Sequence, residues 1–210
     1  MKQSVILFFF LLCLLAARAQ QRAVTGNGDE VILNQDGTWK YVNDSLAGGQ
    51  TTIDTSKQTF SRQPAATFLV KSSKVDVGIY LDPKKWSFEK KAGQAAEFEF
   101  SSKTKDLYGM FISEKIEIPM ATLKLAALKN AGEAAPDIHI TKEEYRYVNN
   151  MLVLLLKMDG TISGIKFTYW GYYYSSPKGT VQLLTYTSAN LVEEYKNDIE
   201  TFLNGFTRIL

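Results

Sequence analysis

Thiol and imidazole groups are almost absent from this 210-residue chain, which has one cysteine, Cys13, and one histidine, His139. Cys13 lies in an N-terminal segment that we expect to be removed. The mature chain would then have no disulfide, no thiol nucleophile and no thiolate metal ligand. A zinc site needs several His or Cys ligands, and a Ser-His-Asp triad would depend on His139 alone. The composition therefore predicts no metal site and no cofactor.

Long apolar runs and basic clusters are also scarce. The longest apolar run, Val5–Ala17, has 13 residues, whereas a membrane-spanning helix needs about 20. The chain has 24 Lys+Arg and 22 Asp+Glu, with no block of five or more basic residues. These features predict that the mature protein is not an integral membrane protein, and they exclude a basic surface of the kind that binds nucleic acid.

The first nineteen residues have the pattern of a secretory signal peptide. Lys2 supplies a positive charge, Val5–Ala17 an apolar core, and Ala17-Arg18-Ala19 small residues at the two positions that a signal peptidase recognises. We expect cleavage after Ala19. Loss of Lys2 and Arg18 leaves 22 basic and 22 acidic residues, so the mature protein is neutral. The predicted location is the periplasm or the extracellular space.

Three segments follow the predicted signal peptide. In residues 20–42, Glu30–Leu33 and residues 38–41 flank an Asn-Gln-Asp-Gly turn, which predicts a β-hairpin. Residues 43–66 are polar, with Gly48-Gly49 and several Ser and Thr, and predict a flexible linker. Residues 67–210 are long enough for one globular domain with its own core.

Within the globular domain, the apolar pattern predicts eight strands and two helices. We expect the strands near residues 68–70, 77–81, 96–102, 107–118, 138–148, 151–157, 162–174 and 180–187. Turns are expected at Asn149-Asn150 and Asp159-Gly160. The first helix should begin at Pro119 and end before Gly132. The last should begin with a capping box formed by Asn190 and Glu193, and its apolar face should run to Phe206.

One strand indicates how the layers are arranged. Residues 151–156, Met-Leu-Val-Leu-Leu-Leu, are apolar without alternation, so both faces of the sheet should be covered at this point. Two helices are available to cover them. The sequence therefore predicts an α+β fold, an antiparallel sheet with helices on both faces, which is an α/β/α sandwich.

The order of these segments resembles the PsbP-like family over most of residues 67–210. The resemblance rests on residues 75–81, Lys85-Trp86, residues 98–100, residues 106–108, Ile118-Pro119 and residues 202–206, in this order. It implies an exported protein that binds or assembles with other molecules and has no catalytic activity, and it transfers no functional residue. In addition, residues 36–41, Asp-Gly-Thr-Trp-Lys-Tyr, are similar to an N-terminal segment of uncharacterised envelope proteins of Gram-negative bacteria.

Aromatic residues supply the candidate binding surfaces. Strand alternation in Tyr169–Tyr174 places Trp170, Tyr172 and Tyr174 on one face. This face could stack on a sugar, hold an apolar molecule or contact a protein partner; alternatively, a helix covers it and it is core. Trp39 and Tyr41 share a face of the hairpin, which either docks on the domain or contacts a partner.

No catalytic residue is predicted. His139, between two isoleucines, is expected on a strand surface, and the pairs Glu143-Glu144 and Glu193-Glu194 are expected in solvent. The favoured hypothesis is a non-catalytic binding or assembly module of the bacterial envelope. One alternative is a small-ligand binding protein that uses the aromatic stripe. Another is a hydrolase that depends on carboxylates alone.

Overall fold

The computed structural model describes residues 21–24, 30–34, 39–41 and 53–209. By the density of its internal contacts the chain divides into two units, residues 1–51 and residues 52–210, which we describe separately. The predicted signal peptide, residues 1–19, lies outside the described residues.

The first unit contains a three-stranded antiparallel sheet in the order β1-β2-β3. Its strands are β1 (Gln21–Val24), β2 (Glu30–Leu33) and β3 (Trp39–Tyr41). Strands β2 and β3 pair with Leu33 opposite Trp39, as expected for the hairpin, while the Asp36-Gly37 turn lies outside the described residues. Strand β1 was not expected, because its sequence Gln-Arg-Ala-Val has no apolar alternation.

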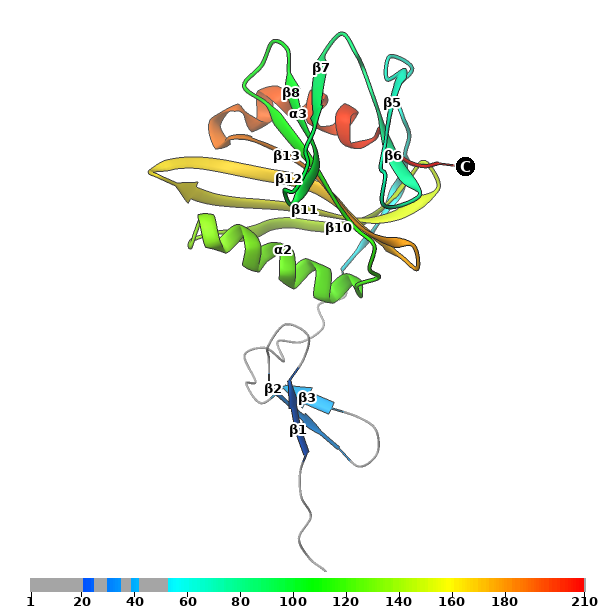
Figure 1. The fold of residues 1–210 in the computed structure, drawn as a ribbon. Helices are drawn as coiled ribbons and strands as arrows, with labels where there is room; N and C mark the ends of the chain where they lie inside the picture. Colours follow the sequence, from blue (N-terminus) through cyan, green and yellow to red (C-terminus); the bar gives the residue numbers. More distant parts are fainter. Residues whose placement is uncertain (1–20, 25–29, 35–38, 42–52, 210) are drawn as a thin grey trace, which may run out of the picture. The chain divides into compact units, whose positions relative to one another are not determined.

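The second unit is built on an eight-stranded sheet in the order β4-β10-β11-β12-β13-β9-β8-β7 and a three-stranded sheet in the order β14-β6-β5 (Figure 1). The strands of the large sheet are β4 (Thr55–Phe60), β7 (Trp86–Lys90), β8 (Ala96–Ser102), β9 (Tyr108–Glu114), β10 (His139–Val148), β11 (Met151–Ile162), β12 (Ile165–Ser176) and β13 (Gly179–Ser188). The small sheet has β5 (Phe68–Lys71), β6 (Val77–Leu81) and β14 (Phe206–Arg208). Apart from the parallel pair β4–β10, the strand pairs of the large sheet are antiparallel.

Two α-helices, α2 (Met120–Ala134) and α3 (Val192–Leu203), pack against different clusters of buried side chains. Leu123 and Ala127 of α2 share a cluster with Leu154 of β11. Helix α3 joins a larger cluster that includes Leu155, the next residue of β11. Since neighbouring residues of a strand point to opposite faces, the unbroken apolar run of β11 is buried on both of its faces, as predicted. In Figure 1, α2 and α3 lie on different sides of the large sheet. The α+β class is confirmed.

The predicted linker boundary is wrong. Thr55–Phe60, placed in the linker of residues 43–66, forms edge strand β4, which pairs with β10. The domain therefore begins near residue 52 rather than residue 67. Strand β4 is held by main-chain hydrogen bonds, including Tyr145 N to Asp54 O at 2.8 Å. Only Phe60 of β4 packs against the core, so the apolar pattern gave no signal for a strand.

The predicted turn at Asp159-Gly160 is also wrong, because β11 continues through both residues to Ile162. The turn follows at Ser163-Gly164, which have φ of 50° and 82°. Gly160 has a different role: a Cβ at this position would lie 2.8 Å from Ile138 Cδ1 and 3.1 Å from Ala135 Cβ. The glycine allows the chain after α2 to approach β11 closely. The turn predicted at Asn149-Asn150 is present, with φ of 47° and 65°.

Both helices differ from the prediction at their ends. Helix α2 passes through Gly132 to Ala134. Helix α3 begins after a short 3₁₀ helix, Ala189–Leu191, and no side chain caps it, so the expected Asn190–Glu193 capping box is wrong. The chain leaves α3 at Asn204, and Phe206 lies on strand β14 rather than on the helix. There Phe206 contacts Tyr174 edge to face, at 5.7 Å between ring centroids.

Candidate functional site

The aromatic stripe of β12 is mainly core. Trp170 and Tyr172 are 5% and 1% exposed, and both belong to the cluster that includes α3. Their alternation is as predicted, but it directs them toward the face that α3 covers. They therefore cannot form a ligand surface, and the hypothesis of a binding stripe is wrong for these two residues.

The hydroxyl of Tyr172 has a structural role. It donates to Asn204 Oδ1 at 2.7 Å and accepts from Arg146 Nη1 at 3.3 Å. Burial raises the pKa of Tyr172 to about 12, although the neighbouring Arg146 opposes the increase. Arg146 is buried as well, and its Nε donates to Glu144 at 2.6 Å. This network joins β10, β12 and the end of α3.

Tyr173, the next residue of β12, is different. It is fully buried on the α2 side of the sheet, and its hydroxyl has no hydrogen-bond partner within residues 53–209. Burial raises the pKa of the Tyr173 hydroxyl strongly. The indole N–H of Trp170 is also buried without a partner in this part of the chain. Such orphaned groups weaken the fold.

Tyr174 is the member of the stripe that reaches a cavity. It is 9% exposed and lines a recess of about 290 Å³ between β6, the β12–β13 turn and β14. We call this recess the Tyr174–Arg208 cavity. Its lining residues are Val75, Asp76, Val77, Tyr174, Ser176, Pro177, Lys178 and Arg208.

Three of the lining residues are charged. Arg208 Nη2 donates to the Tyr174 hydroxyl at 3.3 Å. This bond, helped by the charge of Asp76, raises the pKa of Arg208 above its ordinary value. Within residues 53–209, neither Arg208 nor Lys178 forms a salt bridge. The cavity thus combines an apolar wall with two cations and one carboxylate.

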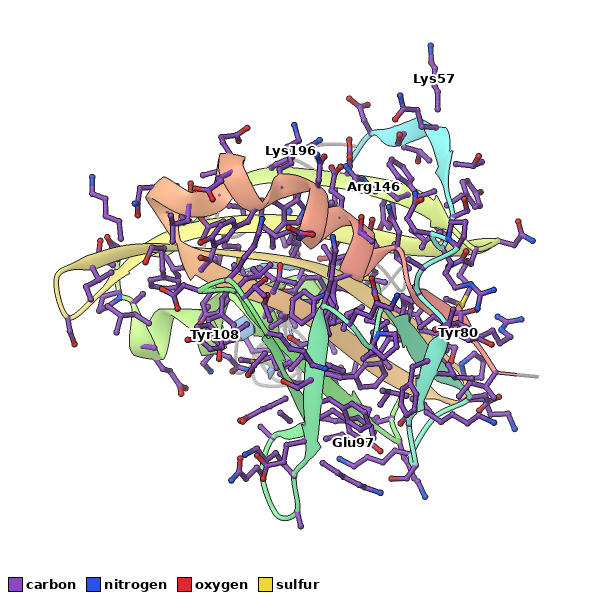
Figure 2. The ribbon with its side chains drawn as sticks, turned by 90° about the horizontal axis from the view of Figure 1, so that it is seen from above. Lys57, Tyr80, Glu97, Tyr108, Arg146 and Lys196 are labelled. Atoms are coloured by element: carbon purple, nitrogen blue, oxygen red, sulfur yellow. The ribbon has the colours of Figure 1, made fainter. Side chains whose placement is uncertain are left out.

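A buried carboxylate lies elsewhere, on β8. Glu97 is 3% exposed and accepts hydrogen bonds from the hydroxyls of Ser72, Ser73 and Ser113 and from the main-chain N–H of Ser73. Burial would raise the pKa of Glu97, but the hydrogen bonds of Ser113, Ser72 and Ser73 outweigh it and lower the pKa. A general acid needs a raised pKa. The hydrogen bonds of Glu97 instead hold the β5–β6 connection on β8 and β9. In Figure 2, Glu97 lies well away from Arg146.

The remaining ionisable candidates are on the surface or in ion pairs. His139 is exposed, with Nδ1 3.0 Å from the carbonyl oxygen of Asp137. Glu143 pairs with Lys124, and Glu144 pairs with Arg146 and Lys142. Glu193 and Glu194 are exposed on α3. In the described ranges, no group of three or more His, Cys, Asp or Glu could hold a metal ion.

The small N-terminal sheet carries the other predicted surface. Trp39 is 53% exposed, and Leu33, opposite it on β2, is 39% exposed. The backbone of Tyr41 pairs with Val31, whereas its side chain lies outside the described residues. Exposure of this Leu33–Trp39 pair is compatible with either hypothesis, docking on the domain or contact with a partner.

Sequence reasoning did not identify Asp76, Lys178 and Arg208. They come from three separate segments, each an ordinary charged residue beside a turn or strand end. The only local signal was Pro177-Lys178-Gly179, which marks the β12–β13 turn. Their proximity arises because β14 returns along β6 at the end of the chain.

Comparison with known proteins identifies the fold. No family model matches the chain, and no curated protein matches it. Among solved structures, it is similar to cyanobacterial PsbP (CyanoP) from Synechocystis sp. PCC 6803, with a TM-score of 0.52 and 12% identity over 70% of this chain and 94% of CyanoP. The large unit therefore has a PsbP-like fold, as the order of its segments predicted. At 12% identity, the similarity concerns the fold alone.

Two further structures are less similar. LpqN, a protein of Mycobacterium tuberculosis involved in cell envelope biogenesis, has a TM-score of 0.46 and 12% identity over 68% of this chain and 90% of its own. PA94 of Pseudomonas aeruginosa, a putative regulator, has a TM-score of 0.39 and 12% identity over 62% of this chain and 89% of its own. Within the described residues, no helix is both long and apolar enough to cross a membrane.

Proposed function

We propose that this chain is an exported, non-catalytic binding or assembly module of the bacterial envelope, built on an α/β/α sandwich. The observation that carries the proposal is the Tyr174–Arg208 cavity. Its wall is formed by Val75, Val77 and Tyr174, and its charged groups are Asp76, Lys178 and Arg208. This combination of an apolar wall and a few polar groups is typical of a binding recess.

The chemistry of the cavity favours binding over catalysis. Asp76 is its one carboxylate, so it lacks the pair that a carboxylate-dependent hydrolase uses. The hydroxyl of Ser176 is bonded to the carbonyl oxygen of Gly179 at 3.2 Å, within its own turn. No imidazole is available there to activate it, since His139 is the only histidine of the chain.

The export part of the proposal rests on the signal-peptide pattern of residues 1–19. Cell fractionation and N-terminal sequencing test it. We expect the protein in the periplasm or the medium, with Gln20 as its first residue. Full-length protein starting at Met1 in the cytoplasm would contradict export.

The binding part is tested by photo-crosslinking in intact cells. A photoreactive amino acid replaces Lys178 at the cavity or, as the matched control, Lys196, an exposed lysine of α3 (Figure 2). We expect a discrete adduct from position 178 that Arg208→Gln removes, and no such adduct from position 196. Equal labelling from both positions would contradict a binding role for the cavity.

The non-catalytic part is tested with the purified protein and a panel of chromogenic esters, glycosides and phosphates. We expect no turnover above the rate without protein. Turnover that disappears when the protein is unfolded would contradict this part.

The cavity also supports a second candidate function, a small-ligand binding protein. Trp170 and Tyr172 are excluded by burial, but Tyr174 lines the cavity. Saturable binding of a small molecule, lost on Tyr174→Ala, would favour this function over assembly with a protein partner.

A further inference from the structure

The Tyr174–Arg208 cavity restricts the size of its ligand. Its volume of about 290 Å³ lies at the lower end of ligand pockets, which span about 300–1,000 Å³. A group with a single ring or a short branched chain would fill it.

The charge of the cavity is unbalanced. Lys178 and Arg208 stand against Asp76 alone, so the lining has a net charge of +1. A smaller cavity of about 60 Å³ provides a contrast: there, Lys85 and Lys105 both form salt bridges with Asp198, at 2.7 Å. The smaller cavity has the same net charge of +1, but both of its lysines are held in ion pairs. At the larger cavity, neither cation forms a salt bridge within residues 53–209.

The hydrogen bond to Tyr174 orients the guanidinium of Arg208. It uses one of the five N–H donors of Arg208, at 3.3 Å. Tyr174 is itself fixed by burial and by its edge-to-face contact with Phe206. The free donors of a guanidinium form a planar fork that fits carboxylate and phosphate oxygens. Lys178 adds a second donor from the β12–β13 turn.

On these grounds we propose that the Tyr174–Arg208 cavity binds a small anion, a carboxylate or a phosphate monoester attached to an apolar group. The anionic head pairs with Arg208 and Lys178, and the apolar group lies against Val75, Val77 and Tyr174. The inference rests on the proposed binding function and specifies its ligand class.

Calorimetric titration of the mature protein, residues 20–210, with three probes tests the inference. Benzoate represents the carboxylates, phenyl phosphate the phosphate monoesters, and benzyl alcohol is a neutral molecule of similar size. A hydrogen bond in which one partner is charged is stronger than one between neutral groups. We therefore expect at least one anion to bind about tenfold more tightly than benzyl alcohol. The anion that binds more tightly identifies the head group that the cavity prefers, carboxylate or phosphate.

Three variants localise the binding. Arg208→Gln and Lys178→Gln should each lower the affinity for the preferred anion about tenfold, while Asp76→Asn should raise this affinity. Lys196→Gln makes the same charge change on α3, outside the cavity lining, and should leave the affinity unchanged. Thermal melting of each variant confirms that it is folded. Equal weakening by Lys178→Gln and Lys196→Gln would overturn the inference, because it would indicate general charge attraction.

Two other results also overturn the inference: no saturable binding of either anion, or equal affinity for benzyl alcohol. Equal affinity leaves the proposed binding function standing, because an apolar molecule still occupies the cavity. Conversion of phenyl phosphate to phenol and inorganic phosphate would instead contradict the non-catalytic part of the proposed function. The two failures are therefore distinguishable.

Discussion

Two neighbouring tyrosines on β12 should respond in opposite directions to removal of the same atom. Tyr172 and Tyr173 are 1% and 0% exposed and point to opposite faces of the sheet. Only the hydroxyl of Tyr172 is hydrogen-bonded. Replacing each by phenylalanine removes one oxygen and keeps the ring, so the difference between the two variants reports on hydrogen bonding.

We expect Tyr172→Phe to destabilise the domain by about 2 kcal/mol. The substitution leaves Asn204 Oδ1 and one N–H of Arg146 unpaired in the interior, and each unsatisfied buried group costs about 1–3 kcal/mol. Tyr173→Phe should stabilise it by about 1 kcal/mol, because it removes a buried hydroxyl that has no partner. For a domain of this size, 1 kcal/mol shifts the Tm by about 2–4 °C.

Urea unfolding followed by circular dichroism measures both changes, and an unchanged m-value shows that the surface exposed on unfolding is the same. A loss of stability in Tyr173→Phe would refute the reasoning, because its hydroxyl would then have a partner. A neutral Tyr172→Phe would show that the Arg146–Tyr172–Asn204 network does not stabilise the fold.

Three further predictions concern other parts of the domain. Glu97→Gln should destabilise the protein at pH 7. Because the folded-state pKa of Glu97 is lowered, its carboxylate stabilises the folded state above the unfolded pKa of about 4.3, and this stabilisation is lost as the pH falls. The difference in Tm from wild type should therefore begin to shrink as the pH falls below about 4 and vanish only below the lowered folded-state pKa of Glu97. Glu99→Gln, a partly exposed control on the same strand, should have little effect at any pH. A chain beginning at residue 53 should unfold cooperatively in urea. A chain beginning at residue 67 lacks β4 and should lose stability or cooperativity. Equal stability of the two chains would show that β4 is dispensable. Gly132→Ala should raise the free energy of unfolding in urea by about 1 kcal/mol, because Gly132 lies inside α2 and a Cβ there meets only Ile138 Cγ2 at 3.7 Å. Destabilisation would contradict the helical position of Gly132.

The sequence predicted most reliably the elements whose signal is local. Asn149-Asn150 form the expected turn because Asn tolerates positive φ. The apolar run of β11 indicated burial on both faces, and Val153 and Leu154 indeed belong to different clusters. In both cases, the physical cause lies within a few residues of the chain.

Elements that depend on distant partners could not be predicted from local pattern. Strand β4 forms through main-chain bonds to β10, and its side chains show little apolar alternation. Gly160 was interpreted as a turn residue, whereas its role is the close approach of Ile138. The Tyr174–Arg208 cavity combines residues from positions 75–77, 174–178 and 208. Alternation separated the two faces of β12 correctly, but it gave no information on which face a helix covers.

Chemical-shift mapping of the mature protein tests most directly whether the Tyr174–Arg208 cavity is the binding site of the domain. Benzoate is added to ¹⁵N-labelled protein, and the backbone amide signals are followed. We expect saturable shifts confined to residues 75–77, the turn at Lys178 and Arg208, and none of these shifts in Arg208→Gln. Shifts centred on another surface, such as the exposed Tyr108 on β9, would contradict a binding role for this cavity, and no saturable shifts with either benzoate or phenyl phosphate would contradict its binding of a small anion.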